Sequence, residues 1–454
     1  MRYNHGRFSW KSVFGAALVF CLAVIVHTVP VAADSVDQVE ERLLKQAARN
    51  IERHRKGDVT LRLRNSDGAQ SKPESIEIEQ TGHDFLLGCI AFDLVGRDIH
   101  NEDLFKQRFK DLFNFAVLPF YWGSYERRPG RPRWQDILEV VEWCKANDIT
   151  VKGHPLVWTH PAGTPKWLSR YSPEETEELL KSRVMRIVDG YSEEIRMWDV
   201  VNEAVHTRTW MHQDKKDYAR ESVADMADYV EKAFRWAHKG NPDATLILND
   251  FALIPDESAR GRFVGLVKEL KSRGVPISGL GLQAHEPRQE WFPPEQTRET
   301  LNEVGELGYP LHITEFTPQS SGKQITGGWR KGKWTEENQA EFAEQLCRLA
   351  FGHPDVVSFT FWGLSDRRIW LEKGGLITEE YKPKPVYERM YKLFHEQWHT
   401  ALTLDGVGED GSATFRGFYG DYRVTVKTTD GQKKTFHRHL RKDSENRWEI
   451  DLAQ

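Results

Sequence analysis

Cysteine is scarce in this chain of 454 residues, which contains four. Cys21 lies near the N-terminus, and Cys89, Cys144 and Cys347 are widely separated in apolar surroundings. Their spacing matches no metal-ligand pattern, so we expect buried thiols rather than a cysteine-based metal centre. One disulfide among the last three is possible, and the sequence does not assign it.

Three further absences narrow the class of protein. The chain has 63 basic and 68 acidic residues and a formal charge of −5, whereas a nucleic-acid surface needs a basic face. The alternating strand and helix pattern described below begins without a Gly-x-Gly-x-x-Gly motif. This absence argues against a dinucleotide-binding sheet. The chain contains no Asn-x-Ser/Thr sequon, so nothing in the sequence predicts N-glycosylation. We therefore expect no nucleic-acid partner and no cofactor.

An apolar run near the N-terminus predicts export. Arg2, Arg7 and Lys11 precede the run at 13–26, and small residues precede Asp34. This pattern predicts a signal peptide at 1–33, with an uncleaved anchor as the alternative. The mature protein is then secreted or periplasmic, with no stable membrane span, and we expect a monomer.

Short β-like segments flank the middle of the chain. A helical pattern covers 39–56, and alternating strand patterns follow at 59–64 and 75–79. The tail is again β-like, and Asp430-Gly431 marks a hairpin. We predict an N-terminal helix and β segment at 34–84 and a C-terminal β segment at 399–454. The two segments are expected to pack together as a small accessory β-sandwich.

Between these segments, apolar runs alternate with amphipathic stretches. The eight apolar runs cover 85–91, 113–118, 150–157, 196–201, 245–248, 279–283, 311–314 and 357–361. The amphipathic stretches include 135–147, 174–190, 218–239, 257–273, 295–307 and 336–351. This α/β alternation predicts a parallel sheet, and eight units predict a closed (β/α)8 TIM barrel at 85–398. An open doubly wound sheet is the alternative.

Polar and aromatic side chains stand where the predicted strands end. They are His154, Trp158, Asn202, Glu203, Asn249, Asp250, Gln283, His285, Glu315, Trp362 and Asp366. Because the carboxyl ends of barrel strands meet at one face, we expect the active site there. Asp366 and Trp370 follow the last strand in a loop and are weaker candidates.

Glu203 and Glu315 are the candidates for chemistry. Two opposed carboxyl groups suit glycoside hydrolysis, in which one is protonated and the other is ionised; in a retaining enzyme they stand about 5–5.5 Å apart. A salt bridge is the alternative for Glu203 alone. A metal site formed by His154, His285 and both glutamates is a further alternative. It would call for a His-x-His pair near strand one, where 88–93 contains no histidine, so we expect no metal.

Several motifs resemble, in order, those of glycoside hydrolase family 10, the retaining endo-β-1,4-xylanases. They are Gly153–Trp158, Trp198–Glu203, Leu248–Asp250, Gly281–His285, Ile313–Glu315 and Phe361–Gly363, within a resemblance that runs from about 85 to 394. The resemblance implies cleavage of internal bonds of xylan or a related polysaccharide or oligosaccharide by double displacement. It implies Glu203 as acid/base and Glu315 as nucleophile. It also implies a surrounding shell of His154, Trp158, Asn202, Gln283, His285 and Trp362.

The segment after the second strand departs from the family pattern. Phe120, Tyr121 and Ser124 stand where the family carries Glu, Asn and Lys to grip xylose units on the non-reducing side. We expect aromatic surface there, with Tyr121 contacting substrate, and a substrate that differs from plain xylan. Thr317 replaces an Asp two residues after the nucleophile, so the tuning of His285 stays open. A catalytically weak carbohydrate-binding protein on the same barrel is the alternative, and the intact glutamate pair favours the enzyme.

Overall fold

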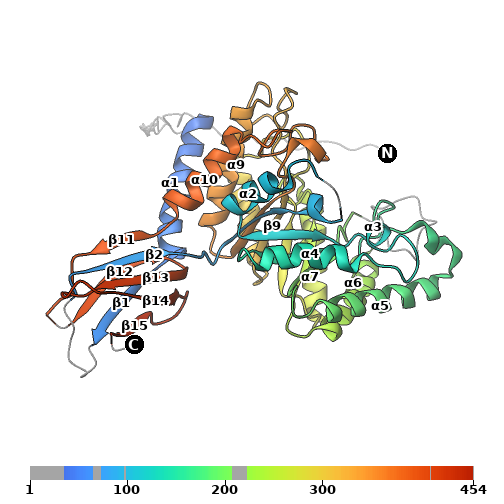
Figure 1. Ribbon diagram of the computed structural model, residues 1–454. Coiled ribbons are helices and arrows are strands. Elements are labelled where there is room, and N and C mark those ends of the chain that lie inside the picture. The colour runs from blue at the N-terminus through green and yellow to red at the C-terminus, as the bar shows by residue number, and fades with distance from the viewer. Residues whose placement is uncertain (1–34, 65–72, 97–98, 207–221, 410, 453–454) are drawn as a thin grey trace, which may run out of the picture. The chain divides into compact units, whose positions relative to one another are not determined.

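The computed structural model describes residues 35–64, 73–96, 99–206, 222–409 and 411–452 (Figure 1). The predicted signal peptide and the first residues of the stretch at 218–239 lie outside these ranges. Among the described helices, none is both long and apolar enough to cross a membrane.

Eight parallel strands form a closed barrel in the order β10-β3-β4-β5-β6-β7-β8-β9. They are β3 (Leu86–Ile90), β4 (Phe115–Pro119), β5 (Thr150–His154), β6 (Met197–Asn202), β7 (Thr245–Asp250), β8 (Gly279–Leu282), β9 (Leu311–Phe316) and β10 (Val356–Phe361). Each overlaps one predicted apolar run. Strand β10 pairs with both β3 and β9, which closes the sheet. The TIM barrel is therefore confirmed, and the open-sheet alternative is wrong.

Helices surround the barrel between successive strands. The helices are α2 (Glu102–Leu112), α3 (Trp122–Tyr125), α4 (Trp134–Lys145), α5 (Pro173–Gly190), α6 (Val223–Gly240), α7 (Glu257–Ser272), α8 (Pro294–Gly305), α9 (Glu336–Gly352) and α10 (Pro385–Lys392). Short 3-10 turns cover Phe92–Leu94, Lys166–Arg170 and Asp366–Arg368, and a π turn covers Leu393–Gln397. All six predicted barrel helices are present.

Three of these helices, α2, α10 and the four-residue α3, were not predicted as separate segments. In α2 the buried side chains of Phe105, Phe109 and Leu112 recur at helical spacing among charged residues. Helix α10 has only eight residues, and two turns are too short for hydrophobic periodicity to identify a helix.

The flanking segments form two sheets that combine strands from both ends of the chain. One has the order β12-β1-β15 and the other β11-β2-β13-β14. Their bounds are β1 (Lys56–Arg64), β2 (Ser75–Gln80), β11 (Ala401–Leu404), β12 (Ser412–Phe418), β13 (Gly420–Lys427), β14 (Lys433–Leu440) and β15 (Arg447–Asp451). Leu61, Ile78, Val424 and Trp448 share one buried cluster. The predicted association of the two segments is thus confirmed, while the predicted domain boundaries stay predictions.

Helix α1 (Val36–His54) precedes β1 and packs against the barrel helix α9. Leu43, Ala47 and Leu349 form the buried contact. The guanidinium of Arg55 then donates to the carbonyl oxygens of Phe351 (2.6 Å), His353 (2.5 Å) and Val356 (2.5 Å). These bonds satisfy carbonyl groups where α9 ends and β10 begins.

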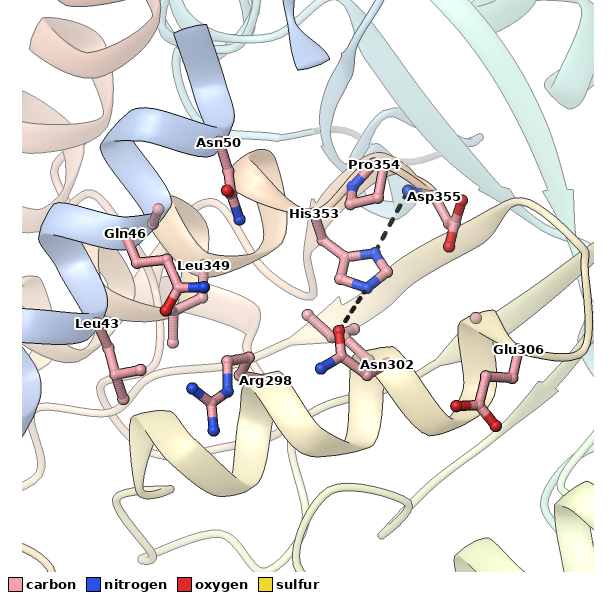
Figure 2. Close-up of a pocket in the computed structure, with 13 residues that line it drawn as sticks. Leu43, Gln46, Asn50, Arg298, Asn302, Glu306, Leu349, His353, Pro354 and Asp355 are labelled. Carbon is pink, nitrogen blue, oxygen red and sulfur yellow. Dashed lines mark hydrogen bonds between the residues drawn. The ribbon is translucent and has the colours of Figure 1, made fainter. Parts of the chain in front are cut away.

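A cavity of about 480 Å³ lies between α1, α8 and the turn after α9 (Figure 2). Figure 2 shows His353 between Asn302, whose Oδ1 lies 3.2 Å from Nε2, and the backbone N–H of Asp355, which donates to Nδ1 (3.3 Å). Because β9 and β10 begin beside this turn, the cavity lies at the amino ends of the strands. The strand-end residues singled out from sequence belong to the opposite, carboxyl-end face.

The three described cysteines, Cys89, Cys144 and Cys347, are buried free thiols. Burial raises the pKa of each thiol above its ordinary value. The described chain therefore contains no disulfide to stabilise it.

Candidate active site

Glu203 follows directly after β6, in a backbone conformation that is unusual for a side chain of its size. Its φ is +62°, in the left-handed region, and its N–H donates to the carbonyl of Asn249 (2.8 Å). Asp250, the last residue of β7, fixes the following turn by accepting from the N–H of Val205 (2.9 Å) and by pairing with Nδ1 of His206 (2.6 Å). Such a conformation costs roughly 1–3 kcal/mol, so the surrounding bonds hold it in place.

Side chains of three described residues donate hydrogen bonds to the carboxyl group of Glu203. Trp158 Nε1 donates to Oε2 (2.8 Å), while Asn202 Nδ2 (3.3 Å) and Gln283 Nε2 (3.2 Å) donate to Oε1. Burial raises the pKa of Glu203 to about 7, assisted by the charge of Asp250 and opposed by the bond from Trp158. This carboxyl group can therefore carry a proton near neutral pH.

Glu315 lies within β9 and is 4 % exposed. Asn249 Nδ2 donates to its Oε1 (2.7 Å). Nε2 of His154 lies 3.8 Å from Oε1, and Nε2 of His285 lies 4.0 Å from Oε2. Burial and then the charge of Glu203 raise the pKa of Glu315 well above its ordinary value. Repulsion between the two carboxyl groups therefore disfavours the state in which both are ionised.

Asn249, at the end of β7, connects the two glutamates. Its Nδ2 donates to Asn202 Oδ1 (2.8 Å) as well as to Glu315, and its Oδ1 accepts from the hydroxyl of Thr314 (2.6 Å). Asn202 in turn donates to Glu203. The sequence placed Asn249 at a strand end without giving it a role. Its bonds to Asn202 and Glu315 could be found only from the fold.

A buried charged cluster lies beneath the pair. Asp199 Oδ2 accepts from Lys152 Nζ (2.6 Å) and from His154 Nδ1 (2.7 Å), and all three side chains are at most 1 % exposed. Although burial opposes its charge, Lys152 and His154 hold the pKa of Asp199 below its ordinary value. Burial lowers the pKa of His154, so this ring is neutral. With its proton on Nδ1, His154 presents Nε2 as an acceptor that has no partner among the described residues.

His285 is also neutral, because burial lowers its pKa to about 3. Its Nδ1 is buried and has no partner in the described part of the chain. Thr317, which stands where the family carries an Asp, has its hydrogen bonds elsewhere. Its hydroxyl donates to the carbonyl of Glu315 (3.2 Å) and accepts from Nε1 of Trp370 (3.2 Å). Trp370 is 40 % exposed and contacts the His285 ring at a centroid distance of 4.8 Å. The weaker candidate Trp370 therefore lies beside the site.

Aromatic rings form the side of the site near β3, β4 and β10. The ring of Tyr121 contacts His154 and Trp158, each at 5.4 Å, and Phe92 at 5.9 Å. Trp362 is 7 % exposed and meets the rings of His154 (4.8 Å) and Phe92 (5.4 Å) edge to face. Burial, followed by the charges of Glu315 and Glu203, raises the pKa of Tyr121 well above its ordinary value. The Tyr121 phenol is therefore neutral.

The expected aromatic surface is absent at Phe120, and this part of the prediction is wrong. Phe120 is fully buried and packs on Tyr125 and Trp198 in the core. Neighbouring residues of an extended chain point to opposite sides, so only one of Phe120 and Tyr121 can face the site. Ser124 donates its hydroxyl to the carbonyl of Tyr121 (3.2 Å).

The contacts of Asp366 are with residues other than the two glutamates. It pairs with the buried ammonium of Lys384 (3.4 Å) and accepts from the N–H of Gly375 (2.8 Å). These contacts fix the loop after β10. Among the described residues, no three His, Cys, Asp or Glu side chains group in a way that could hold a metal ion.

A closed parallel barrel with two buried carboxyl groups at the carboxyl ends of its strands is the arrangement of a barrel glycosidase. The sequence pattern of the family described as Glycosyl hydrolase family 10 matches residues 94–393, and the chain belongs to this family.

Similar proteins carry xylanase names. Endo-1,4-beta-xylanase B of Thermotoga neapolitana is 31% identical over 289 residues, which cover 61% of this chain and 78% of that protein. Endo-1,4-beta-xylanase 2 of Arabidopsis thaliana is 27% identical over 390 residues, 84% of this chain and 33% of the relative. The chain thus spans about a third of that longer relative. The crystal structure of xylanase 10B from Thermotoga petrophila RKU-1 with xylobiose has a TM-score of 0.58 and 25% identity, covering 69% of this chain and 95% of that one.

Proposed function

We propose that this protein is an exported, monomeric, retaining β-glycanase that cleaves internal β-1,4 bonds of xylan or a related polysaccharide. The observation that carries the proposal is the pair of buried carboxyl groups joined through Asn202 and Asn249. Membership of the family and the names of the relatives support the same reaction class. The predicted signal sequence supports export.

In the first step, protonated Glu203 donates its proton to the glycosidic oxygen while ionised Glu315 attacks the anomeric carbon. The bond from that carbon to the leaving oxygen breaks, and a glycosyl ester forms on Glu315. In the second step, Glu203 removes a proton from water as the water oxygen attacks the same carbon. The Glu315 carboxylate leaves, and two inversions give net retention.

The surroundings of the pair suit both steps. The Glu203 pKa of about 7 allows this group to give up and regain a proton near neutral pH. Asn249 holds Glu315 through a bond that an ionised carboxylate accepts more strongly than a neutral one. A sugar hydroxyl that donates to Glu315 adds to this preference and favours the proton on Glu203.

Three buried polar atoms around the pair have no partner among the described residues. They are His154 Nε2, Gln283 Oε1 and His285 Nδ1. Buried polar groups are rarely left unpaired, and sugar hydroxyl groups can both donate to and accept from such atoms. With the rings of Tyr121, Trp158 and Trp362 nearby, the site offers polar and apolar contacts together, as a sugar requires.

A comparison of Glu315→Ala with wild type tests the enzyme directly. An aryl β-xylobioside and a panel of xylan, glucan and mannan serve as substrates, and NMR follows the anomeric form of the first product. We expect retained configuration and a loss of at least about a thousandfold in kcat. The matched control is Glu306→Ala, which removes an exposed glutamate beside α8. Equal hydrolysis by wild type and Glu315→Ala on every substrate would favour a carbohydrate-binding protein instead.

A second variant assigns the acid. Glu203→Ala is compared on an aryl glycoside with a good leaving group and on xylan. The first step on the activated substrate should largely survive, because a good leaving group needs little protonation. Equal losses on both substrates would contradict the acid role of Glu203.

A further inference from the structure

A second cavity, of about 390 Å³, is lined almost entirely by arginines. Its walls are Gly96, Arg127, Arg128, Arg131, Arg133 and Asp136. Four of these six residues are cationic arginines and one is an aspartate, in a chain whose formal net charge is −5. We call this set of four arginines the arginine pocket.

Within the described residues, most of the positive charge of the pocket has no ion-pair partner. Arg133 pairs with Asp136 (2.7 Å) and donates to the carbonyl of Val95 (2.7 Å). Arg127, Arg128 and Arg131 are exposed, and within the described residues none of their guanidinium groups forms an ion pair. Clustering like charges costs folding free energy, so folding alone does not explain four arginines in one short turn.

The backbone that carries these arginines is held in place. Buried Glu126 accepts from the N–H of Gly130 (2.6 Å) and from Trp122 Nε1 (3.1 Å), and its carbonyl accepts from Trp167 Nε1 (3.0 Å). The N–H of Arg133 donates to the carbonyl of Tyr125 (2.8 Å). Two prolines, at 129 and 132, restrict the turn further. An anion that binds here therefore meets a preorganised loop, which lowers the entropic cost of binding.

The pocket belongs to the same two loops that form the aromatic side of the catalytic face. Tyr121, which contacts His154 and Trp158, precedes the arginines in the segment that follows β4. Phe92, which contacts Tyr121, lies in the turn after β3 that also supplies Val95 and Gly96 to the pocket. A glycan chain that rests on Tyr121 can therefore extend toward the arginines.

We propose that the arginine pocket binds a carboxylate on the substrate, so that the enzyme acts preferentially on a β-1,4-glycan with uronic-acid substituents. Guanidinium groups match carboxylate geometry with two parallel hydrogen bonds, and a neutral glycan offers no such partner. This inference rests on the proposed glycanase function and specifies its substrate class.

The test compares one polymer with and without its charge. Glucuronoxylan and the same polymer after reduction of its carboxyl groups differ in charge but have the same backbone. Wild type should show a kcat/KM about fivefold higher on the acidic form at low salt, as two exposed ion pairs suggest. In R127Q/R131Q this ratio should fall to near one. R49Q/R53Q removes two exposed charges from α1 and should keep the fivefold ratio.

Binding without turnover separates this inference from the proposed function. Native gel electrophoresis of the Glu315→Gln protein is run in gels that contain glucuronoxylan, its reduced form or sulfated xylan. Stronger retardation by glucuronoxylan, lost with R127Q/R131Q, supports the pocket even if no polymer is hydrolysed. Equal retardation by the acidic and reduced forms overturns it. Retardation by sulfated xylan alone overturns the assignment to a carboxylate.

Discussion

The two sides of the catalytic face are built from different chemistry. On the side of β6 to β9, amides and carboxyl groups bond directly to one another, as in the link from Glu203 through Asn202 and Asn249 to Glu315. On the side of β3, β4 and β10, the rings of Tyr121, Phe92 and Trp362 meet edge to face. The loops that follow β3 and β4 supply Phe92 and Tyr121 and also line the arginine pocket.

This difference separates two requirements of a glycan hydrolase. Bond cleavage needs groups fixed within tenths of an ångström, and a closed hydrogen-bond network provides such positioning. Selection among sugar polymers needs surface that can change without disturbing that network. The motifs that contain the two glutamates lie on the first side, and the departures at Phe120, Tyr121 and Ser124 fall in the second. The motif at Phe361–Gly363 lies on the second side, and the departure at Thr317 lies on the first.

Apart from the two glutamates, the largest effect is expected at Asn249. Asn249→Ala removes the bonds to Asn202 and Glu315 together, so kcat should fall by about a hundredfold with a smaller change in KM. Steady-state kinetics on an aryl β-xylobioside measure this. Asn338→Ala, at the start of α9, is the control and should retain full activity. A change confined to KM would mean that Asn249 contributes to binding rather than to positioning the pair.

Glu203→Gln should stabilise the protein at pH 8. The folded pKa of Glu203 is about 7 against an ordinary 4.5, so the wild type loses stability as the pH rises through this interval. Gln carries no charge and avoids that loss, which is on the order of 3 kcal/mol. Urea unfolding at pH 5 and pH 8 should show a gain that is large at pH 8 and small at pH 5. The opposite dependence on pH would contradict the raised pKa.

Tyr121 tests the aromatic side. Tyr121→Ala should raise KM for xylo-oligosaccharides about tenfold and change kcat less, because the ring supplies contact area rather than chemistry. Tyr121→Phe keeps the ring and should stay within about twofold of wild type. If both variants lose activity equally, the phenol hydroxyl carries the effect, and the contrast between the two sides weakens.

The smallest effect is expected at Thr317. Thr317→Val keeps the shape and removes the acceptor for Trp370 Nε1, so Trp370 should become less ordered beside His285. We expect KM to rise about twofold with kcat unchanged, since one neutral hydrogen bond is lost. Tryptophan fluorescence quenching together with kinetics checks this. A fall in kcat would show that Thr317 also supports Glu315 through its bond to the carbonyl.

Much of the fold could be predicted from periodicity. The eight strands are buried apolar runs, and the helices between them carry one apolar stripe, so both patterns are visible in the chain. The strand-end position of Glu203, Gln283, His285 and Glu315 then followed from barrel geometry. The contacts of Gln283 with Glu203 and of His285 with Glu315 confirm their proximity, while their catalytic roles stay predictions.

The orientation of individual side chains could not be predicted. Strand β6 shifts its register against β7 between Asp199 and Val201, and Glu203 has a positive φ, so simple alternation fails where the strand ends. Trp158 was expected in the shell around the glutamate pair, but its donation to Glu203 was not predicted. Phe120 points into the core, where it packs on Tyr125 and Trp198. These directions depend on partners that are distant in sequence.

The sheet β12-β1-β15 has a consequence for how the chain is made. Thr60 in β1 pairs with Thr414 in β12 and with Arg447 in β15, so its first partner is synthesised 354 residues later. At a synthesis rate of about 5–20 residues per second, both edges of β1 stay without their sheet partners for roughly 20–70 s. During that interval its apolar residues can pair with another nascent chain. Slow translation or shortening from the C-terminal side should therefore promote aggregation, and a chaperone that binds extended segments should raise the yield of folded protein.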